Sequence, residues 1–228
     1  MSIKESFLKV KREIPHHVKI VLAAKMRMPE EVKQAISAGA EIIGENYVQE
    51  AEKIKHVLGE KAKIVKWHMI GALQKNKINK ALRIFDCIQT VDSVELAEAL
   101  NKRAEVIDKK MSVFIEINIG SEITKSGIPP DYKTLERLVI HISRMNHLKL
   151  EGLMTMGPLT GRAEGVRPFF RKAKMFFDKL KSLNIDNVDL KYLSMGMSNS
   201  YRVAIEEGAN MVRLGTVIFG NRTYDLKT

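Results

Sequence analysis

Short apolar runs rich in Val, Ile and Leu alternate along the chain with longer stretches in which apolar residues recur every three or four positions. The short runs are typical of buried strands, and the longer stretches are typical of amphipathic helices. Strands are predicted at residues 18–24, 41–43, 64–68, 86–90, 112–118, 149–154, 189–193 and 211–214. Helices are predicted at residues 4–12, 46–58, 75–83, 93–108, 131–146, 164–183 and 198–207, and one more opens at Pro29 and ends near Gly39.

A predicted helix separates each of these strands from the next. Strands that alternate with helices pair in parallel, because each helix returns the chain to the same edge of the sheet. Eight such units in 228 residues predict an α/β fold, a (β/α)8 barrel of the TIM type with a leading helix at residues 4–12. A doubly wound open sheet is the alternative. No linker or shift in composition divides the chain, so we expect a single domain over residues 1–228.

Composition narrows the class of protein further. Hydrophobic residues make up 45% of the chain and charged residues 29%, which is usual for a globular domain and excludes disordered and collagen-like chains. No apolar run approaches the ~18 residues that span a bilayer, and the first residues lack the apolar core of a signal peptide. The single cysteine, Cys87, cannot form an internal disulfide, and no Cys/His cluster has the spacing of a zinc site. We therefore expect a soluble, cytoplasmic protein without a metal, in which Cys87 is a small buried side chain.

The formal charge of +11 suits nucleic acid, an anionic membrane surface or phosphorylated small molecules. The basic residues are spread along the whole chain between acidic ones, and no nucleic-acid-binding motif is present, so we favour a solvated basic surface over nucleic-acid binding. The predicted helix at 164–183 is both basic and amphipathic. In a βα alternation its apolar stripe is expected to pack on the sheet and not on a membrane.

Polar residues near the carboxyl ends of the last two predicted strands suggest a site for an anion. In parallel barrels the chemistry lies at these strand ends, and the loops after strands seven and eight often hold a phosphate. Ser194-Met-Gly-Met-Ser198 offers a glycine and two hydroxyls, and Gly215-Thr216 offers a second small corner. Ser198 is expected to start the following helix, whose N–H groups and dipole favour an anion. The alternative is an ordinary turn with a helix cap.

Lys25 follows the first predicted strand directly. At the rim of an apolar strand, loss of hydration favours a neutral amine that can attack a carbonyl, although a lysine that reaches to solvent is the simpler alternative. A lysine opposite a phosphate corner suits a phosphorylated aldehyde held as a Schiff base. Pyridoxal 5′-phosphate (PLP) and the intermediate of a sugar phosphate aldolase both meet that description. His68, beside Trp67, is interpreted as a hydrogen-bonded residue at the rim and not as a general base.

Six motifs in order resemble those of the pyridoxal phosphate homeostasis proteins, single-domain relatives of the alanine racemase N-terminal barrel. The resemblance covers the chain from the first predicted strand to Arg222. Its motifs are Lys25, Gly44-Glu-Asn-Tyr-Val-Gln-Glu50, His68-Met-Ile-Gly-Ala-Leu-Gln-Lys-Asn-Lys77, Lys125-Ser-Gly-Ile-Pro129, Ser194-Met-Gly-Met-Ser198 and Arg213-Leu-Gly-Thr-Val-Ile-Phe-Gly220. The family commonly has other residues at Ala24, Met26 and Ser200. None of these departures removes a group that the cofactor needs, and they concern the fine tuning of the first and seventh loops.

The resemblance also implies a role for each site residue. Lys25 would form the Schiff base with PLP, and Asn46 would face the cofactor ring. The phosphate would be held by Ser198 with Ser194 close by, and by the corner of Gly215 and Thr216. Arg213 would approach the pyridine nitrogen. Because an arginine only donates, that nitrogen would stay unprotonated, which disfavours extended carbanion chemistry.

As function, the resemblance implies reversible PLP binding in the management of its intracellular supply. We expect PLP as the cofactor, no catalytic residue, a monomer, and contact with amino acids and with apo-enzymes that need PLP. A PLP-dependent amino-acid racemase is the alternative. Racemisation needs two bases on opposite faces of the substrate, and alanine racemases complete the second with a further, β-rich domain. The sequence continues only to Thr228 after Thr216, so we expect no such domain here.

Overall fold

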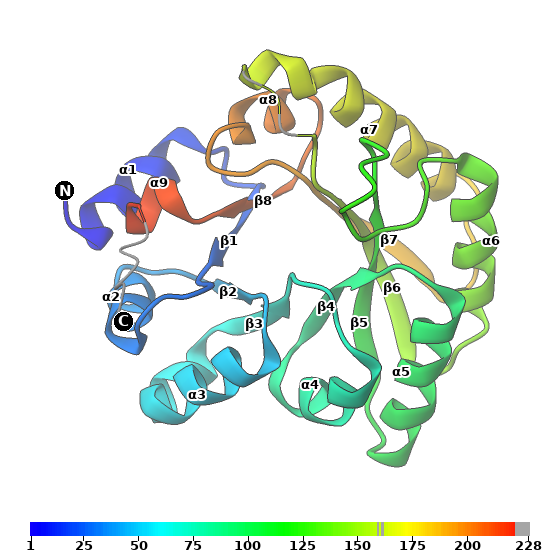
Figure 1. Cartoon of the computed structure of the whole chain (residues 1–228), viewed down its shortest axis with the longest axis horizontal. Coiled ribbons are helices and arrows are strands. Elements are labelled where there is room, and N and C mark those ends of the chain that lie inside the picture. The colour runs from blue at the N-terminus through cyan, green and yellow to red at the C-terminus, as the bar shows by residue number, and fades with distance from the viewer. Residues whose placement is uncertain (159, 161, 222–228) are drawn as a thin grey trace.

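Eight parallel strands form a closed barrel in the computed structural model of the chain (Figure 1). The structure describes residues 1–158, 160 and 162–221. The strands pair in sequence order around the barrel, and β1 closes it against β8. Their bounds are β1 Lys19–Ala23, β2 Ile42–Glu45, β3 Lys66–Met69, β4 Cys87–Val91, β5 Met111–Ile117, β6 Leu148–Thr155, β7 Val188–Ser194 and β8 Met211–Leu214.

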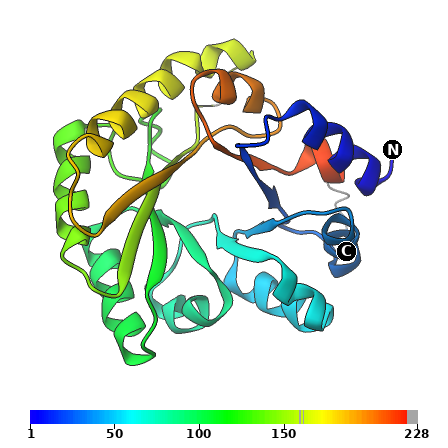
Figure 2. The ribbon, with the colours of Figure 1, turned by 180° about the vertical axis from the view of Figure 1, so that it is seen from behind.

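Helices surround the barrel on its outside, as both end-on views show (Figures 1 and 2). Helix α1 precedes the first strand and packs beside α2 and α9. The α-helices are α1 Ile3–Glu13, α2 Pro29–Ser37, α3 Val48–Leu58, α4 Ile78–Ile84, α5 Val94–Val106, α6 Tyr132–Ser143, α7 Arg167–Lys181, α8 Tyr201–Glu206 and α9 Thr216–Phe219. Short 3-10 helices lie at Gly59–Ile64, Lys75–Lys77 and Ala163–Val166.

The alternation of side chains along each strand divides the interior into two layers. On β5, Val113 and Ile115 belong to the large apolar layer between the strands and the helices. Phe114 belongs to a smaller cluster inside the barrel, together with Met154 from the neighbouring strand β6 and Val21 from β1. Alternate residues point to opposite faces of a strand, so the residues that reach the barrel interior can be read at every second position.

The structure confirms the predicted (β/α)8 barrel with its leading helix and excludes the open-sheet alternative, because β1 pairs with β8. Helix α7 buries its apolar stripe, including Phe170 and Phe177, as expected of a helix that packs on the sheet. One helix start was wrong. The helix predicted from residue 198 begins at Tyr201, because Gly196 turns the chain with a positive φ of 93° and Ser198 belongs to the loop. The end of the expected domain, residues 222–228, lies outside the described residues.

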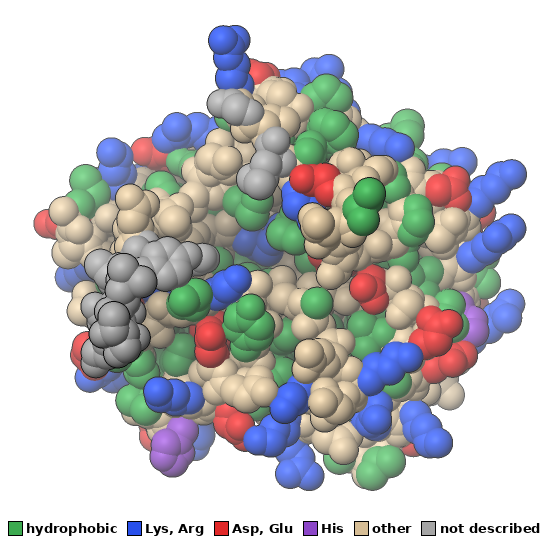
Figure 3. Space-filling view, in the orientation of Figure 1, with side chains coloured by type: hydrophobic (Ala, Val, Ile, Leu, Met, Phe, Trp, Pro, Cys, Tyr) green, Lys and Arg blue, Asp and Glu red, His purple; other side chains and the backbone are tan. Residues whose placement is uncertain are grey.

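Two features of the surface bear on the expectations from composition. Over the residues that the structure describes, no helix is long and apolar enough to cross a bilayer. On the face shown in Figure 3, Lys and Arg side chains are distributed around the outline of the molecule and do not form one patch. The basic side chains on this face are therefore dispersed, as the interleaving of basic and acidic residues predicts.

Candidate functional site

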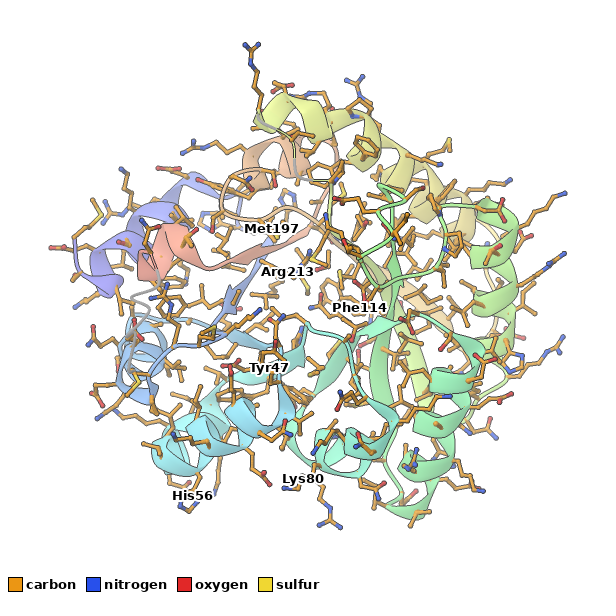
Figure 4. All side chains as sticks on the ribbon, in the orientation of Figure 1. Tyr47, His56, Lys80, Phe114, Met197 and Arg213 are labelled. Carbon is orange, nitrogen blue, oxygen red and sulfur yellow. The ribbon has the colours of Figure 1, made fainter. Side chains whose placement is uncertain are left out.

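A cavity of about 440 Å³ opens at the carboxyl ends of the strands. It collects residues from the loops after β1, β2, β3, β6, β7 and β8, the end of the barrel where parallel barrels carry their chemistry. Figure 4 shows Met197, Arg213 and Tyr47 around the centre of the barrel, whereas His56 and Lys80 lie on peripheral helices. The cavity is lined by Ala23, Lys25, Asn46, Ile70, Met156, Met197, Ser198, Asn199, Arg213, Gly215 and Thr216.

Lys25 lies two residues beyond the end of β1 and is half-buried in the cavity wall. Its Nζ lies 5.6 Å from the centre of the Tyr47 ring, which is within the range of a cation–π contact. The chain then turns sharply, because Met26 adopts a left-handed backbone conformation with a φ of 59° and donates its N–H to Glu50 Oε2 at 3.1 Å. This turn holds the lysine backbone at the rim while its side chain stays in the cavity.

Arg213 reaches the cavity from the middle of β8 and is only 4% exposed. Its Nη1 donates to the backbone oxygen and to the hydroxyl of Ser194, both at 2.9 Å, and its Nη2 donates to the backbone oxygen of Thr155 at 2.9 Å. Burial lowers the pKa of Arg213 to about 10, so the guanidinium keeps its charge near neutral pH. These bonds fix a charged donor in the floor of the cavity.

Asn46 follows β2 and owes its position to a close backbone approach. A Cβ at Gly71 would lie 2.5 Å from the Asn46 backbone oxygen and 2.7 Å from its Cα. Only glycine lets the loop after β3 pass this closely. The Gly71 oxygen in turn accepts a 2.8 Å hydrogen bond from the buried Thr90 hydroxyl. The loops after β2 and β3 are thereby locked together, and Asn46 is held on the cavity lining.

Ser198, Gly215 and Thr216 meet at one corner of the cavity, as predicted. The Ser198 hydroxyl accepts from the backbone N–H of Gly215 at 3.2 Å and from that of Val217 at 3.3 Å. The expectation that Ser198 starts the following helix was wrong, since α8 begins three residues later. The corner instead joins the loop after β7 to the first residues of α9, so its donors are two hydroxyls and backbone N–H groups.

Ser194 does not reach the cavity. It is fully buried at the end of β7, where its hydroxyl accepts from Arg213 and donates to Gln89 Oε1 at 2.7 Å. The resemblance had placed it close to the phosphate. The geometry gives it a different task, because it lies behind Arg213 and helps to orient the guanidinium.

The sequence reasoning did not single out Glu116, which shares the barrel interior with Arg213. Glu116 is 3% exposed on β5. It lies two residues after Phe114, so the two side chains face the same side of the strand. Burial raises the pKa of this carboxyl to about 7, and the charge of Arg213 acts in the opposite direction. The signal that could have found it is the two-residue period of β5, which places residues 112, 114 and 116 on one face.

Comparison with known proteins identifies relatives of the whole chain. The model of the alanine racemase N-terminal domain family matches residues 2–223. A pyridoxal phosphate homeostasis protein of Aquifex aeolicus is 39% identical over 206 residues, which cover 90% of this chain and 88% of that protein. The protein of the same name from Pasteurella multocida is 35% identical, and the match covers 98% of this chain and 99% of that relative.

Solved structures extend the same relationship. PipY of Synechococcus elongatus without PLP matches with a TM-score of 0.90 at 30% identity, over 96% of this chain and all of that one, and PipY with PLP bound matches with a TM-score of 0.87. An alanine racemase of Clostridium difficile shares the fold with a TM-score of 0.82 at 18% identity, and this chain covers 58% of it. Because a family model spans nearly the whole chain and close relatives match from end to end, the chain belongs to the alanine racemase N-terminal domain family, among the pyridoxal phosphate homeostasis proteins.

Proposed function

We propose that this protein binds PLP reversibly and holds it for the intracellular supply of the cofactor, with Lys25 as the point of covalent attachment. The observation that carries the proposal is one cavity in which Lys25, Arg213 and the corner of Ser198 and Thr216 meet. A lysine amine, a fixed cation and a set of hydroxyl and N–H donors are the groups that a phosphorylated pyridine aldehyde needs. The names of the relatives, and PipY with PLP bound, support the same ligand.

Each residue of the cavity has a distinct task in this proposal. Bound PLP supplies an aldehyde that a lysine can hold as a reversible Schiff base. Ser198, Thr216 and the backbone N–H groups beside them bind the phosphate, and Arg213 donates toward the pyridine nitrogen. Because Arg213 cannot accept a hydrogen bond, it favours the unprotonated ring. Asn46 contacts the ring, and Ser194 orients Arg213 from behind.

A holding protein must also release its ligand. Lys25 has no ion pair among the described residues, and Tyr47, the ring beside it, is half exposed. The cavity opens to solvent along this side, so amino acids can reach the attachment point and compete for the aldehyde. We propose that apo-enzymes in the cytoplasm are the recipients of the released PLP. The single cysteine, which is free and buried, is compatible with a reducing compartment.

Attachment to Lys25 is tested by reduction of the PLP-loaded protein with borohydride, followed by mass mapping. We expect the added mass on Lys25 alone, and we expect Lys25→Ala to lose the absorption band of the bound cofactor. The fold of that variant should be unchanged, because a half-buried lysine at a loop contributes little packing. Mass on Lys75 or Lys125 would contradict the assignment. Lys75→Ala, at an exposed position of the short 3-10 helix Lys75–Lys77, is the matched control.

The racemase alternative predicts a different result with the same protein. We expect the PLP-loaded protein, incubated with L-alanine in deuterium oxide, to exchange and racemise Cα far more slowly than typical enzymatic rates of ~1–10³ s⁻¹. It should also transfer PLP to an added apo-enzyme, measured as recovered enzyme activity. Racemisation within that range would replace the holding function with the catalytic one.

A further inference from the structure

A second cavity, of about 380 Å³, lies at the opposite end of the barrel, where the strands begin. Lys19, Lys66, Cys87 and Met211, which line it, are each the first residue of a strand. None of its lining residues belongs to the cavity that holds Lys25. Its remaining lining residues are Glu41, Ile42, His68, Asp86, Ser112, Phe114, Glu151 and Tyr192.

Three rings form one wall of this second cavity. Phe114 and Tyr192 stack with their centres 5.8 Å apart and an angle of 26° between their planes. The His68 and Phe114 rings meet edge to face, with their centres 6.4 Å apart and an angle of 82° between their planes. Cys87 and Met211 add apolar, polarisable surface beside them. A planar ring that enters here can pack on aromatic side chains, in the offset or edge-on arrangements that such rings favour.

A chain of hydrogen bonds through the barrel fixes which nitrogen of His68 carries a proton. Arg213 donates to the Ser194 hydroxyl at 2.9 Å, and a guanidinium has no acceptor, so that hydroxyl must use its own proton elsewhere. It donates to Gln89 Oε1 at 2.7 Å, which turns the Gln89 amide nitrogen toward His68 Nδ1 at 2.8 Å. The amide nitrogen only donates, so Nδ1 accepts. A neutral His68 therefore carries its proton on Nε2.

His68 is held in this neutral form. It is 7% exposed, and burial lowers its pKa to about 4. Its Nδ1 is turned toward Gln89, and Nε2 lies across the ring from that bond. In the part of the chain that the structure describes, Nε2 has no hydrogen-bond partner. The wall of the second cavity thus presents an N–H donor to the cavity, and a ligand that carries an acceptor can bond to it.

The lysines and carboxylates that line the second cavity are all ion-paired. Lys19 pairs with Glu41 at 3.0 Å and Lys66 pairs with Asp86 at 3.3 Å. Glu151 also lines the cavity, and it belongs to an ion-pair network with three residues outside the lining, through the contacts Lys149–Glu151, Lys149–Asp189, Lys191–Glu151 and Lys191–Asp189. Four lysines are balanced by four carboxylates, in a protein whose overall charge is +11. An anion therefore finds paired lysines here, whereas the other cavity is lined by Lys25 and Arg213.

We propose that the second cavity is a binding site for a small, uncharged, planar ring compound that presents a hydrogen-bond acceptor to His68 Nε2. The aromatic wall selects a flat ring, the unpartnered N–H selects an acceptor, and the ion-paired lining selects against a net charge. This ligand class differs from the phosphorylated aldehyde of the cavity at the other end, and the inference does not depend on the proposed function.

Nicotinamide is the probe for the experiment, because it is uncharged, planar and carries a carbonyl acceptor. It is titrated into PLP-loaded protein, so that the cavity of Lys25 is filled, and binding is followed by calorimetry. Imidazole ¹H–¹⁵N spectra report the protonated nitrogen of His68 at the same time. We expect saturable binding with one site and a proton on Nε2 that shifts on titration. No saturable binding, or a proton on Nδ1, would overturn the proposal.

Two variants and two controls locate the site. His68→Phe keeps a ring but removes the donor, and it should weaken nicotinamide binding about three- to tenfold. Tyr192→Ala removes part of the aromatic wall on a half-buried residue, and it should weaken binding even if His68→Phe fails to fold. Arg103→Ala, on a surface depression elsewhere, should leave binding unchanged. Nicotinate, which differs by its charge, should bind at least tenfold more weakly. The assignment would be refuted if nicotinate bound as tightly as nicotinamide. It would also be refuted if both cavity variants bound nicotinamide as tightly as the parent protein.

Discussion

Lys25 and Arg213 serve the proposed ligand in opposite ways, and their surroundings differ accordingly. Arg213 is buried and fixed by three hydrogen bonds, so it contributes a charge whose position is set before any ligand arrives. Lys25 contacts the exposed face of Tyr47 and stays free to swing. A group that only orients a ligand benefits from rigidity, because less entropy is lost on binding. A group that must form and release a bond needs the freedom that the loop after β1 gives it.

The two hydroxyls of the phosphate corner can be tested one at a time. We expect Ser198→Ala and Thr216→Val each to weaken PLP binding by about 1.5–3 kcal/mol, since each removes a hydrogen bond to a charged group. Pyridoxal, which lacks the phosphate, should lose much less affinity in the same variants. Equilibrium dialysis with both ligands measures the difference. Equal losses for PLP and pyridoxal would mean that these hydroxyls do not bind the phosphate.

Two pairs of consecutive strands, β3 with β4 and β7 with β8, are joined inside the barrel by one network of hydrogen bonds. His68 on β3 bonds to Gln89 on β4, Gln89 bonds to Ser194 on β7, and Ser194 bonds to Arg213 on β8. The bonds between these members are buried, and such a network stabilises one arrangement only while it is complete. This network of hydrogen bonds therefore fixes the orientation of Arg213 toward one cavity and of His68 toward the other.

Removing the middle of this network should destabilise the protein. Gln89→Leu removes the acceptor of the Ser194 hydroxyl proton and the donor to His68 Nδ1, and an unpaired buried polar group costs about 1–3 kcal/mol. We expect a loss of that size in the free energy of unfolding, measured by urea denaturation, together with weaker PLP binding because Arg213 is less well oriented. Gln74→Leu, at an exposed position, is the control and should change stability little. A Gln89→Leu variant as stable as the parent would show that the network is not a structural tie.

The elements themselves could be predicted from the sequence, and the contacts between them only in part. Strands such as Ser112 to Asn118 stand out as short runs of apolar residues. Proline and glycine mark helix ends, as Pro29 and Gly39 do for one helix. Helix α9 has only four residues, too few for any period to show. The loop of Ser198 depends on the turn at Gly196, which the pattern does not reveal. The family motifs named Lys25, Asn46, Arg213 and Thr216, and the structure places all four on the lining of one cavity. Ser194 and Gln89 could not be paired without the register of β4, β7 and β8.

Buried carboxyls contribute to the pH dependence of stability in a way that exposed ion pairs do not. Most of the surface ion pairs involve exposed side chains, where each pair contributes about 0–1 kcal/mol. Glu45 on β2 is 0% exposed, and burial, helped by the charge of Glu50, raises its pKa to about 8. Glu116 acts in the same direction, with a pKa raised to about 7. Both carboxyls therefore hold their protons in the folded state at pH values where the unfolded chain has lost them.

This difference sets the sign of the pH dependence. Between the ordinary pKa of 4.5 and the raised value of about 8, the unfolded state binds fewer protons at Glu45 than the folded state, so stability falls as the pH rises. We expect Glu45→Gln to remove that slope. Relative to the parent, the variant should gain about 4–5 kcal/mol in the free energy of unfolding between pH 4.5 and pH 8.5. Urea denaturation across this range measures the gain, and Glu105→Gln, at an exposed helix position, should show no such trend. A constant difference between Glu45→Gln and the parent at all pH values would mean that Glu45 ionises normally in the folded protein.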